Sequence, residues 1–310
     1  MAVVVTGASG FVGRSLCRAL AGRGHAVRAV LRPGVPAPGP GIDRAEIDDL
    51  RNAAAWPRLL DGSSAVVHLA ARAHQIDETG ADAAKIAAEI NSDLTRDFAA
   101  AARTAGAGRV VFLSSAGAQE AERRLAAGES LETLWLERPY QTSKLAAERA
   151  LEPLERGGYA VVILRAPLVY GPDAPGNFRQ LRRLMERGVP LPLGKVDNRR
   201  SFVFLGNLVD VLVRLVEVVP PLIGSFDVDD GAPVSSAEVA RLTAAALGRK
   251  ARLLPVPPRL LERGMRLVGR ARSAESLLGD LVLDSTPLRE ALGWRPRWTL
   301  AEGLAESVRG

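Results

Sequence analysis

The chain opens with a short apolar run that breaks directly into a glycine-rich turn and then into a helical pattern. In Val3-Val-Val-Thr-Gly-Ala-Ser-Gly-Phe-Val-Gly13, the glycines stand at positions 7, 10 and 13. The first glycine permits a tight turn, the second lets backbone N–H groups approach a pyrophosphate, and the third lets the helix lie close to the strand. An ordinary strand-to-helix turn also uses glycine, so the rest of the chain has to supply the context. The turn predicts a dinucleotide site that involves Gly7, Ser9, Gly10, Phe11, Val12 and Gly13.

Strand-like apolar runs recur along the first half of the chain. They lie at 26–31, 65–70, 109–114 and 160–165, and alanine-rich helical stretches at 82–105 and 143–156 separate the later ones. This alternation predicts an α/β fold with a doubly wound parallel sheet. After Pro172 the alternation stops and proline-rich connections begin. We therefore expect a dinucleotide-binding Rossmann domain over 1–172, with a later contribution from about 199–217, and a smaller α/β substrate-binding lobe over 173–310.

Composition narrows the class of protein. With 310 residues, 47% of them hydrophobic, the chain can bury a sizeable core. Its single cysteine, Cys17, excludes an internal disulfide and a cysteine-based zinc site, and no metal cluster is evident. The most apolar long segment, 207–223, carries three charged residues, which predicts an amphipathic helix rather than a membrane span. Without a secretory signal at its start, the protein is expected to be soluble and cytoplasmic.

The positive charge of the chain is concentrated in one segment. The net charge is +6, and residues 249–272 hold eight basic side chains against the single acid Glu262. No aromatic residues interleave with basic ones as in nucleic-acid-binding motifs, so no nucleic-acid partner is expected. The segment is compatible with a solvated helix face, or with an anion-attracting surface near a phosphorylated substrate or a membrane.

A candidate catalytic group lies between these regions. In Tyr140-Gln-Thr-Ser-Lys144 the phenol and the ammonium stand four residues apart, so they share one face of a helix, and we expect Lys144 to lower the pKa of Tyr140. A hydroxyl from Ser114 or Ser115, at the end of a predicted strand, could bind the same substrate oxygen. Together these groups form a proton relay for hydride transfer, with the tyrosine as acid or base and the serine as orienting group.

The order of these motifs resembles that of the extended short-chain dehydrogenases/reductases over nearly the whole chain. Val66-Val-His-Leu-Ala-Ala71, Asn91 and Arg165-Ala-Pro-Leu-Val-Tyr-Gly-Pro172 complete the pattern. Later pieces at 176–178, 197–208 and 292–296 resemble the nucleotide-sugar branch, which includes UDP-glucose 4-epimerase and the 4-keto-reductases of UDP-linked N-acetylated deoxysugars. This branch implies a nucleotide-diphosphate sugar as substrate, reaction at a ring carbon such as C4, and a homodimer packed through the helices that include 82–105 and 143–156.

The resemblance also implies roles for single residues. Ser115 matches the catalytic serine better than Ser114, and it joins Tyr140 and Lys144. Asn177 and Arg200 resemble residues that grip the diphosphate of the sugar nucleotide, although a turn asparagine and a surface arginine are the ordinary interpretations. His68 is expected in the core, and His74 is expected either in a plain loop or facing the sugar. The remaining cofactor contacts that the resemblance implies are Asp49, Leu50, Leu69, Ala70, Ala71, Asn91, Tyr140, Lys144, Pro167 and Val169.

Cofactor choice separates the possible reactions. Enzymes that keep NAD usually carry an acid at the end of the second strand, whereas this chain reads Leu31-Arg32-Pro33, and an arginine can meet a 2′-phosphate. Arg32 therefore favours NADP over NAD, and with it a 4-keto-sugar reductase over a 4-epimerase. Dehydration is disfavoured because Ala116-Gly117-Ala118 offers no acid after the catalytic hydroxyl. A non-catalytic dinucleotide sensor is the alternative of another class, but such proteins typically lack the tyrosine or the lysine.

Overall fold

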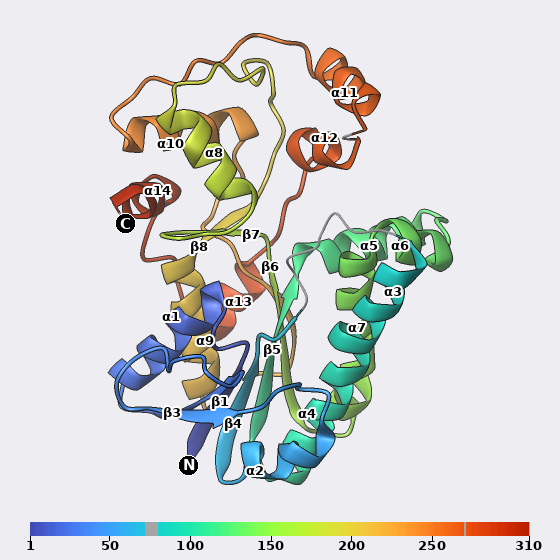
Figure 1. Cartoon of the computed structure of the whole chain (residues 1–310), viewed down its shortest axis with the longest axis vertical. Coiled ribbons are helices and arrows are strands. Elements are labelled where there is room, and N and C mark those ends of the chain that lie inside the picture. Colours follow the sequence, from blue (N-terminus) through green and yellow to red (C-terminus); the bar gives the residue numbers. More distant parts are fainter. Residues whose placement is uncertain (72–79, 270, 310) are drawn as a thin grey trace. The chain divides into compact units, whose positions relative to one another are not determined.

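The structure is a computed structural model that describes residues 1–71, 80–269 and 271–309, with side chains at all of these except 271–273. Seven parallel strands form the main sheet (Figure 1), in the order β3-β2-β1-β4-β5-β6-β9. Because the strand order reverses between β1 and β4, the carboxyl ends of these two strands flank the position where such sheets bind ligands. The predicted doubly wound parallel sheet is confirmed. The strands are β1 (Ala2–Thr6), β2 (Ala26–Leu31), β3 (Ile42–Glu46), β4 (Ser63–His68), β5 (Arg109–Ser115), β6 (Ala160–Ala166) and β9 (Gly224–Asp227).

Helices cover both faces of this sheet (Figure 1). The helices α4 and α7 pack on one face against β4, β5 and β6, and α1 packs on the other face against β1, β2 and β3. The predicted helix over 82–105 is found as three consecutive segments, the middle one a π-helical turn. Apart from the helices given below with the second compact unit, the helical elements are α1 (Phe11–Gly22), η1 (Ala53–Ala55), α2 (Trp56–Leu60), α3 (Ala81–Ala87), η2 (Ala88–Asp93), α4 (Leu94–Thr104), α5 (Ala116–Ala126), α6 (Leu131–Glu137), α7 (Pro139–Arg156), α9 (Leu205–Glu217) and α13 (Thr286–Leu292).

Two elements differ from the sequence expectation. The amphipathic helix expected over 207–223 is α9, which ends at Glu217, because Pro220 and Pro221 cannot continue a helix. The edge strand β3 was not predicted, since only Ile42 of its five residues is buried and its other side chains do not follow the pattern of a core strand. Among the described residues, every helix is too short or too polar to cross a bilayer.

The core of the main sheet is aliphatic and aromatic. Val66, Phe98, Phe112 and Leu151 meet in one buried cluster that joins β4 and β5 to α4 and α7. Cys17 is buried on α1, and burial raises the pKa of its thiol to about 12, so it is a packed side chain and not a nucleophile.

The chain divides into two compact units. The first comprises Met1–Ala166, Val209–Asp227 and Thr286–Trp294, and the second comprises Pro167–Leu208, Val228–Ser285 and Arg295–Gly310. The sequence placed the boundary near 172 and the later return near 199–217, and it did not foresee the return at 286–294, which is α13. The roles of the two units, dinucleotide binding and substrate binding, stay predictions.

The second unit has its own small sheet and core. Its two parallel strands pair with each other, and buried Met185, Leu193 and Ala240 form the centre of its apolar cluster. A half-buried carboxylate, Asp230, ties the unit together by accepting hydrogen bonds from the Tyr170 hydroxyl at 2.6 Å and the Asn207 amide at 2.7 Å. The elements of this unit are β7 (Leu168–Tyr170), α8 (Asn177–Glu186), β8 (Phe202–Phe204), α10 (Ser236–Ala246), α11 (Pro258–Leu267), α12 (Ala271–Leu278) and α14 (Leu300–Arg309).

Candidate active site

The three glycines of the first turn are required for different reasons. Gly7 has a φ of +67°, and a Cβ there would lie 2.8 Å from the carbonyl carbon of Leu69. A Cβ at Gly13 would lie 2.2 Å from the Gly7 carbonyl oxygen, so α1 can approach the turn only without a side chain. A Cβ at Gly10 would meet only the Gly7 oxygen, at 3.1 Å. The first and third glycines are therefore needed by the fold itself, and the second is needed only if something else approaches the turn.

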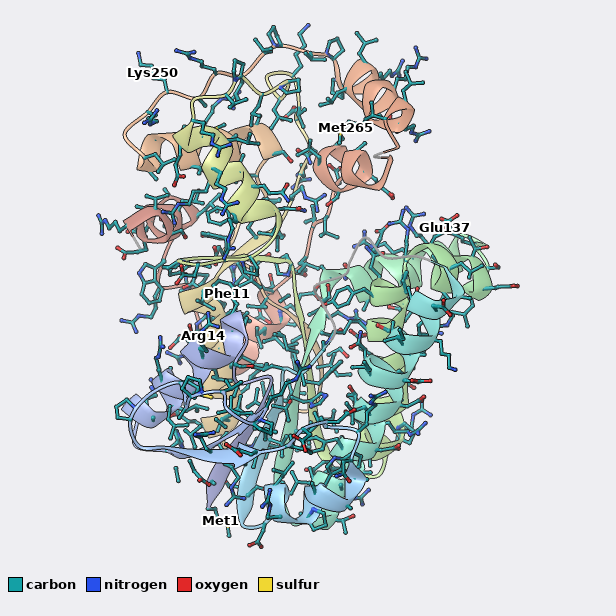
Figure 2. All side chains as sticks on the ribbon, viewed as in Figure 1. Met1, Phe11, Arg14, Glu137, Lys250 and Met265 are labelled. Carbon is teal, nitrogen blue, oxygen red and sulfur yellow. The ribbon has the colours of Figure 1, made fainter. Side chains whose placement is uncertain are left out.

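The N-terminus of α1 suits a phosphate group. Its N-cap residue is Gly10, which has no side chain to cap the helix, and the first turn contains no acidic residue. Arg14 lies one turn on, beside the start of the helix at Phe11 (Figure 2), and its Nη1 donates to the Ser9 carbonyl oxygen at 2.7 Å. The positive end of the helix dipole is therefore not offset by an acid of the helix, and the residues fit the pyrophosphate of a dinucleotide.

Other predicted cofactor residues lie at the same edge of the sheet. Arg32 directly follows β2 and is exposed, and Leu69, Ala70 and Ala71 directly follow β4 and are half-buried. The N–H of Ala70 donates to the Thr6 hydroxyl at 3.2 Å, which holds the loop after β4 against the end of β1. Because parallel strands end at one edge, these residues surround the point at which the strand order reverses.

Asp49 and Leu50, after β3, lie in different surroundings. Leu50 is half-buried against the core cluster. The Asp49 carboxylate accepts two hydrogen bonds from the Arg51 guanidinium, at 2.9 and 2.6 Å, and these bonds, together with the charges of Arg51 and Arg32, lower its pKa. The sequence analysis did not identify Arg51, although an arginine two residues after Asp49 could have been recognised as a partner of that carboxylate. The charges of Arg32 and Arg51 thus both act on the carboxylate of Asp49, a predicted cofactor contact.

Tyr140 and Lys144 lie on one helix, as expected. Pro139 occupies the first position of α7, where a proline costs no hydrogen bond, so the helix starts immediately before Tyr140. The Tyr140 phenol is hydrogen-bonded to the Ser115 side chain. Ser115 ends β5 and caps α5, where its Oγ accepts a hydrogen bond from the Gly117 N–H at 3.1 Å. The serine and the tyrosine are thereby held at the carboxyl end of β5.

The electrostatics of the pair differ from the expectation. Burial raises the pKa of Tyr140 to about 12, and the hydrogen bond from Ser115 opposes this increase only partly. Lys144 is 2% exposed, its Nζ donates to the Leu113 carbonyl oxygen at 2.9 Å, and it lies 4.4 Å from the centroid of the Phe112 ring. Burial lowers the pKa of Lys144 to about 7. The expected lowering of the Tyr140 pKa by Lys144 is therefore wrong for this structure, because the ammonium points to β5 and is itself costly to charge.

A buried carboxylate that sequence reasoning missed stands one turn beyond the lysine. Glu148 accepts hydrogen bonds from the Arg165 guanidinium at 3.1 and 2.6 Å and from the Ser114 hydroxyl, and its charge opposes the lowering of the Lys144 pKa. The Arg165 Nη2 also lies 3.6 Å from the Glu122 Oε2. The available signal was the spacing of four residues between Lys144 and Glu148 on one helix face. This network directs Ser114 toward Glu148, whereas Ser115 is bonded to Tyr140.

Asn91 supports the catalytic helix from the π-helical turn η2. It is buried, and its Nδ2 donates to the Ser143 hydroxyl at 2.9 Å, which in turn donates to the Tyr140 carbonyl oxygen at 2.8 Å. This chain of bonds holds the first turn of α7 against η2. π-Helical turns are frequent at functional sites.

His68 is a core residue, as expected. It is 1% exposed between the Thr6 and Thr95 hydroxyls, at 2.9 and 3.2 Å, and burial lowers its pKa to about 3. The Thr95 hydroxyl already donates to the Asn91 carbonyl oxygen, so it accepts from the His68 Nε2–H, and Nδ1 is left to accept from Thr6. The imidazole is therefore neutral and structural.

The predicted substrate residues belong to the second unit. Asn177 is exposed at the first position of α8, directly after Gly176 with its φ of +70°. The Arg200 Nη1 donates to the Gly279 carbonyl oxygen at 2.7 Å, which fixes the side chain. Pro167 and Val169 lie at the start of this unit, Val169 within β7. The roles of these residues stay predictions, and His74 lies outside the described residues.

Comparison with known proteins identifies the family. Residues 3–221 match the NAD dependent epimerase/dehydratase family. UDP-glucose 4-epimerase of Vibrio cholerae is 32% identical over 311 residues, which cover 99% of this chain and 94% of the relative. dTDP-4-dehydro-6-deoxy-D-allose reductase of a Streptomyces species is 29% identical and covers 96% of this chain and 95% of its own length.

A solved structure is also similar to this chain over its whole length. MoeE5, in complex with UDP-glucuronic acid and NAD, is 26% identical and superposes with a TM-score of 0.72, covering 100% of this chain and 98% of its own. The resemblance to the extended short-chain dehydrogenases/reductases that the motifs carried is thereby confirmed, and the chain belongs to the NAD-dependent epimerase/dehydratase family of enzymes.

Proposed function

We propose that the protein is a reductase that acts on the 4-keto group of a nucleotide-diphosphate sugar and uses NADPH. The main support for reduction with NADPH is Arg32. This exposed arginine directly follows β2, at the place where enzymes that keep NAD usually have an acid. The charge of Arg32 also lowers the pKa of Asp49, whose carboxylate is hydrogen-bonded to Arg51, so Arg32 is the candidate partner of a 2′-phosphate and Arg51 is already paired. NADPH, the cofactor with that phosphate, suits a reductase, because a reductase releases its oxidised cofactor after each turnover and binds a reduced one.

The catalytic group fits the reductive direction. Bound nicotinamide cofactor would supply the hydride, and its binding would fall to the first turn, to Lys144 and to the loop after β4. Tyr140, with a pKa raised to about 12, holds its proton at neutral pH and would donate it to the carbonyl oxygen as negative charge develops there. Ser115 would orient that oxygen from its position beside the phenol.

The nucleotide-sugar substrate is supported by the relatives. Two of them are named for nucleotide sugars, and MoeE5 binds UDP-glucuronic acid. Asn177 and Arg200 are our candidates for the diphosphate of the substrate, and Arg200 is already fixed in one conformation by the Gly279 carbonyl oxygen. An arginine held in this way loses little freedom when it binds phosphate.

A 4-epimerase is the second candidate. It is favoured by the Vibrio cholerae UDP-glucose 4-epimerase, whose identity of 32% over nearly the whole chain exceeds that of the Streptomyces reductase. An epimerase returns the hydride to the same substrate and therefore keeps its cofactor.

Identification of the retained cofactor separates the two candidates. The purified protein is denatured and any released dinucleotide is identified by mass spectrometry, and the affinities for NADPH and NADH are then measured on cofactor-free protein. A reductase is expected to release little cofactor and to bind NADPH more tightly. Stoichiometric NAD, together with interconversion of UDP-glucose and UDP-galactose without added cofactor, would establish the epimerase instead.

Arg32→Asp tests the reasoning behind the choice. The substitution should shift the preference from NADPH toward NADH, because a carboxylate binds ribose hydroxyls and repels a 2′-phosphate. Arg58→Asp is the matched control, since it places the same charge change at another exposed arginine of the first unit. An unchanged ratio in Arg32→Asp would remove the basis for preferring the reductase.

A further inference from the structure

The positive charge of this protein comes from a single segment. The chain contains 41 basic and 35 acidic residues, and residues 249–272 contain eight of the basic ones and one of the acidic ones, which leaves 33 basic and 34 acidic residues elsewhere. The remainder of the chain is thus close to neutral. Any long-range attraction of this protein to a negatively charged partner is therefore directed to this segment.

The helix α11, within this segment, is amphipathic and mostly uncovered. Its residues fall on two sides at helical spacing: Leu260, Leu261, Met265 and Leu267 on one, and Arg259, Arg263 and Arg266 with Glu262 on the other. None of its residues is buried. Figure 2 shows Met265 on this helix and Lys250 on the connection that leads to it.

Within the part of the chain that the structure describes, the apolar side is covered along one edge, where Leu261 and Met265 are half-buried. Leu261 packs against the core cluster of the second unit, together with Leu253 and Leu277. In contrast, Leu260 is 58% exposed, Leu267 is 88% exposed and the following Val268 is 69% exposed. A soluble surface helix normally turns its leucines inward, so three large apolar side chains beside a row of arginines require a partner.

Charge decides which partner fits. A large amphipathic moment, arginines on the polar side and leucine on the other are the features of helices that lie in the plane of a membrane interface. A second copy of the chain would place like-charged arginine rows next to each other, with only Glu262 to offset them. An anionic bilayer offers both the apolar layer for the leucines and the negative headgroups for the guanidinium groups. We propose that α11 docks this protein on the surface of an anionic lipid bilayer.

Vesicle binding of the full-length protein tests the electrostatic part. Sedimentation with vesicles of phosphatidylcholine containing 30% phosphatidylglycerol should carry the protein down at about 0.1 M salt, and vesicles of phosphatidylcholine alone should not. R259Q/R263Q/R266Q should weaken binding about a hundredfold, because each arginine near the surface contributes roughly a factor of five. R156Q/R241Q/R309Q is the matched control: it removes the same charge from three exposed helical arginines, each paired with a glutamate of its own helix as Arg266 is with Glu262, and should leave binding unchanged.

A second variant tests insertion of the apolar side. L260S/L267S retains every charge and should weaken vesicle binding at least tenfold, since the two side chains lose their place in the bilayer. Both side chains are exposed, so the melting temperature should not fall. Equal loss of binding in the control triple variant, or unaltered binding in L260S/L267S, would overturn the proposal. A change of oligomeric mass in L260S/L267S with vesicle binding intact would assign the face to a second copy. No substrate is needed, so the outcome is independent of the proposed reaction.

Discussion

Neighbouring serines at the end of β5 have opposite environments. Ser115 is hydrogen-bonded to Tyr140, whereas Ser114 is buried and donates to Glu148. The sequence placed both at the end of a strand and favoured Ser115 by its distance to the tyrosine. The structure adds a physical reason for that preference, because Ser114 is already committed to a buried carboxylate. The assignment itself stays a prediction.

Exchange of each serine for alanine separates the two roles. Ser115→Ala should lower kcat about a hundredfold with little change in stability, and Tyr140→Phe should lower it by about two to four orders of magnitude with dinucleotide binding retained. Ser114→Ala should instead lower the free energy of unfolding by about 2 kcal/mol, because it removes a hydrogen bond to a charged group. Steady-state rates and urea unfolding measure both quantities. A larger loss of kcat in Ser114→Ala than in Ser115→Ala would reverse the assignment.

Glu148 is the counter-charge of two buried or half-buried cations. Its carboxylate binds Arg165 and supports the charge of Lys144, so Glu148→Gln removes the counter-charge of Lys144 and leaves Arg165 with only the more distant Glu122 and Asp227. We expect this variant to lower the free energy of unfolding by about 3–5 kcal/mol at pH 7. Glu152→Gln, one turn further along α7, breaks an exposed pair with Arg156 and should cost less than about 1 kcal/mol. Equal stabilities of the two variants would show that the Glu148 network contributes nothing.

At the scale of elements, the first turn and α1 form the most closely specified unit. Gly7 and Gly13 are required by the contacts of the fold, whereas Gly10 borders open space apart from one carbonyl oxygen. The three glycines therefore divide into two that the contacts of the fold require and one, Gly10, that the fold does not require and that we predict to border the cofactor. The sequence pattern had assigned the roles in the same order: the tight turn to Gly7, the approach of a pyrophosphate to Gly10 and the close approach of the helix to Gly13.

Alanine at two of these positions distinguishes folding from binding. Gly13→Ala should destabilise the protein by several kcal/mol, because its Cβ would fall 2.2 Å from a carbonyl oxygen and α1 would have to move away. Gly10→Ala should fold with nearly the wild-type melting temperature but bind dinucleotide at least about tenfold more weakly, since the methyl group would occupy the phosphate position. Thermal unfolding and fluorescence titration with NADPH check this pair. Full affinity in Gly10→Ala would place the pyrophosphate elsewhere.

At the scale of the whole molecule, acid sensitivity is linked to the core of the first unit. His68 is neutral in the folded protein, with a pKa lowered from 6.5 to about 3 by burial. Between these two pH values the unfolded chain binds a proton that the folded protein does not. The stability contributed by the neutral imidazole is therefore complete above pH 6.5 and decreases as the pH falls toward 3.

The comparison of wild type with His68→Gln isolates this effect. Below pH 6.5 the wild type should lose about 1.4 kcal/mol of unfolding free energy per pH unit from this group, and the variant should lack that part of the slope. Urea unfolding at pH 7, 6, 5 and 4 measures both slopes, and carboxylates contribute equally to the two proteins. Parallel slopes would mean that His68 is protonated in the folded state.

The homodimer implied by the family resemblance also stays a prediction, which light scattering can check.

The sequence by itself determined the local features of this protein. Strand, turn and helix periodicity, the glycines of the first turn, and the four-residue spacing of Tyr140 and Lys144 are properties of short segments, so they are readable without a structure. Tertiary contacts decided the rest: the pairing of Glu148 with Arg165, the return of α13 to the first unit and the lowered pKa of Lys144. Each of these depends on which distant residues become neighbours, or on how deeply a charge is buried, and neither is encoded in the spacing of residues along the chain.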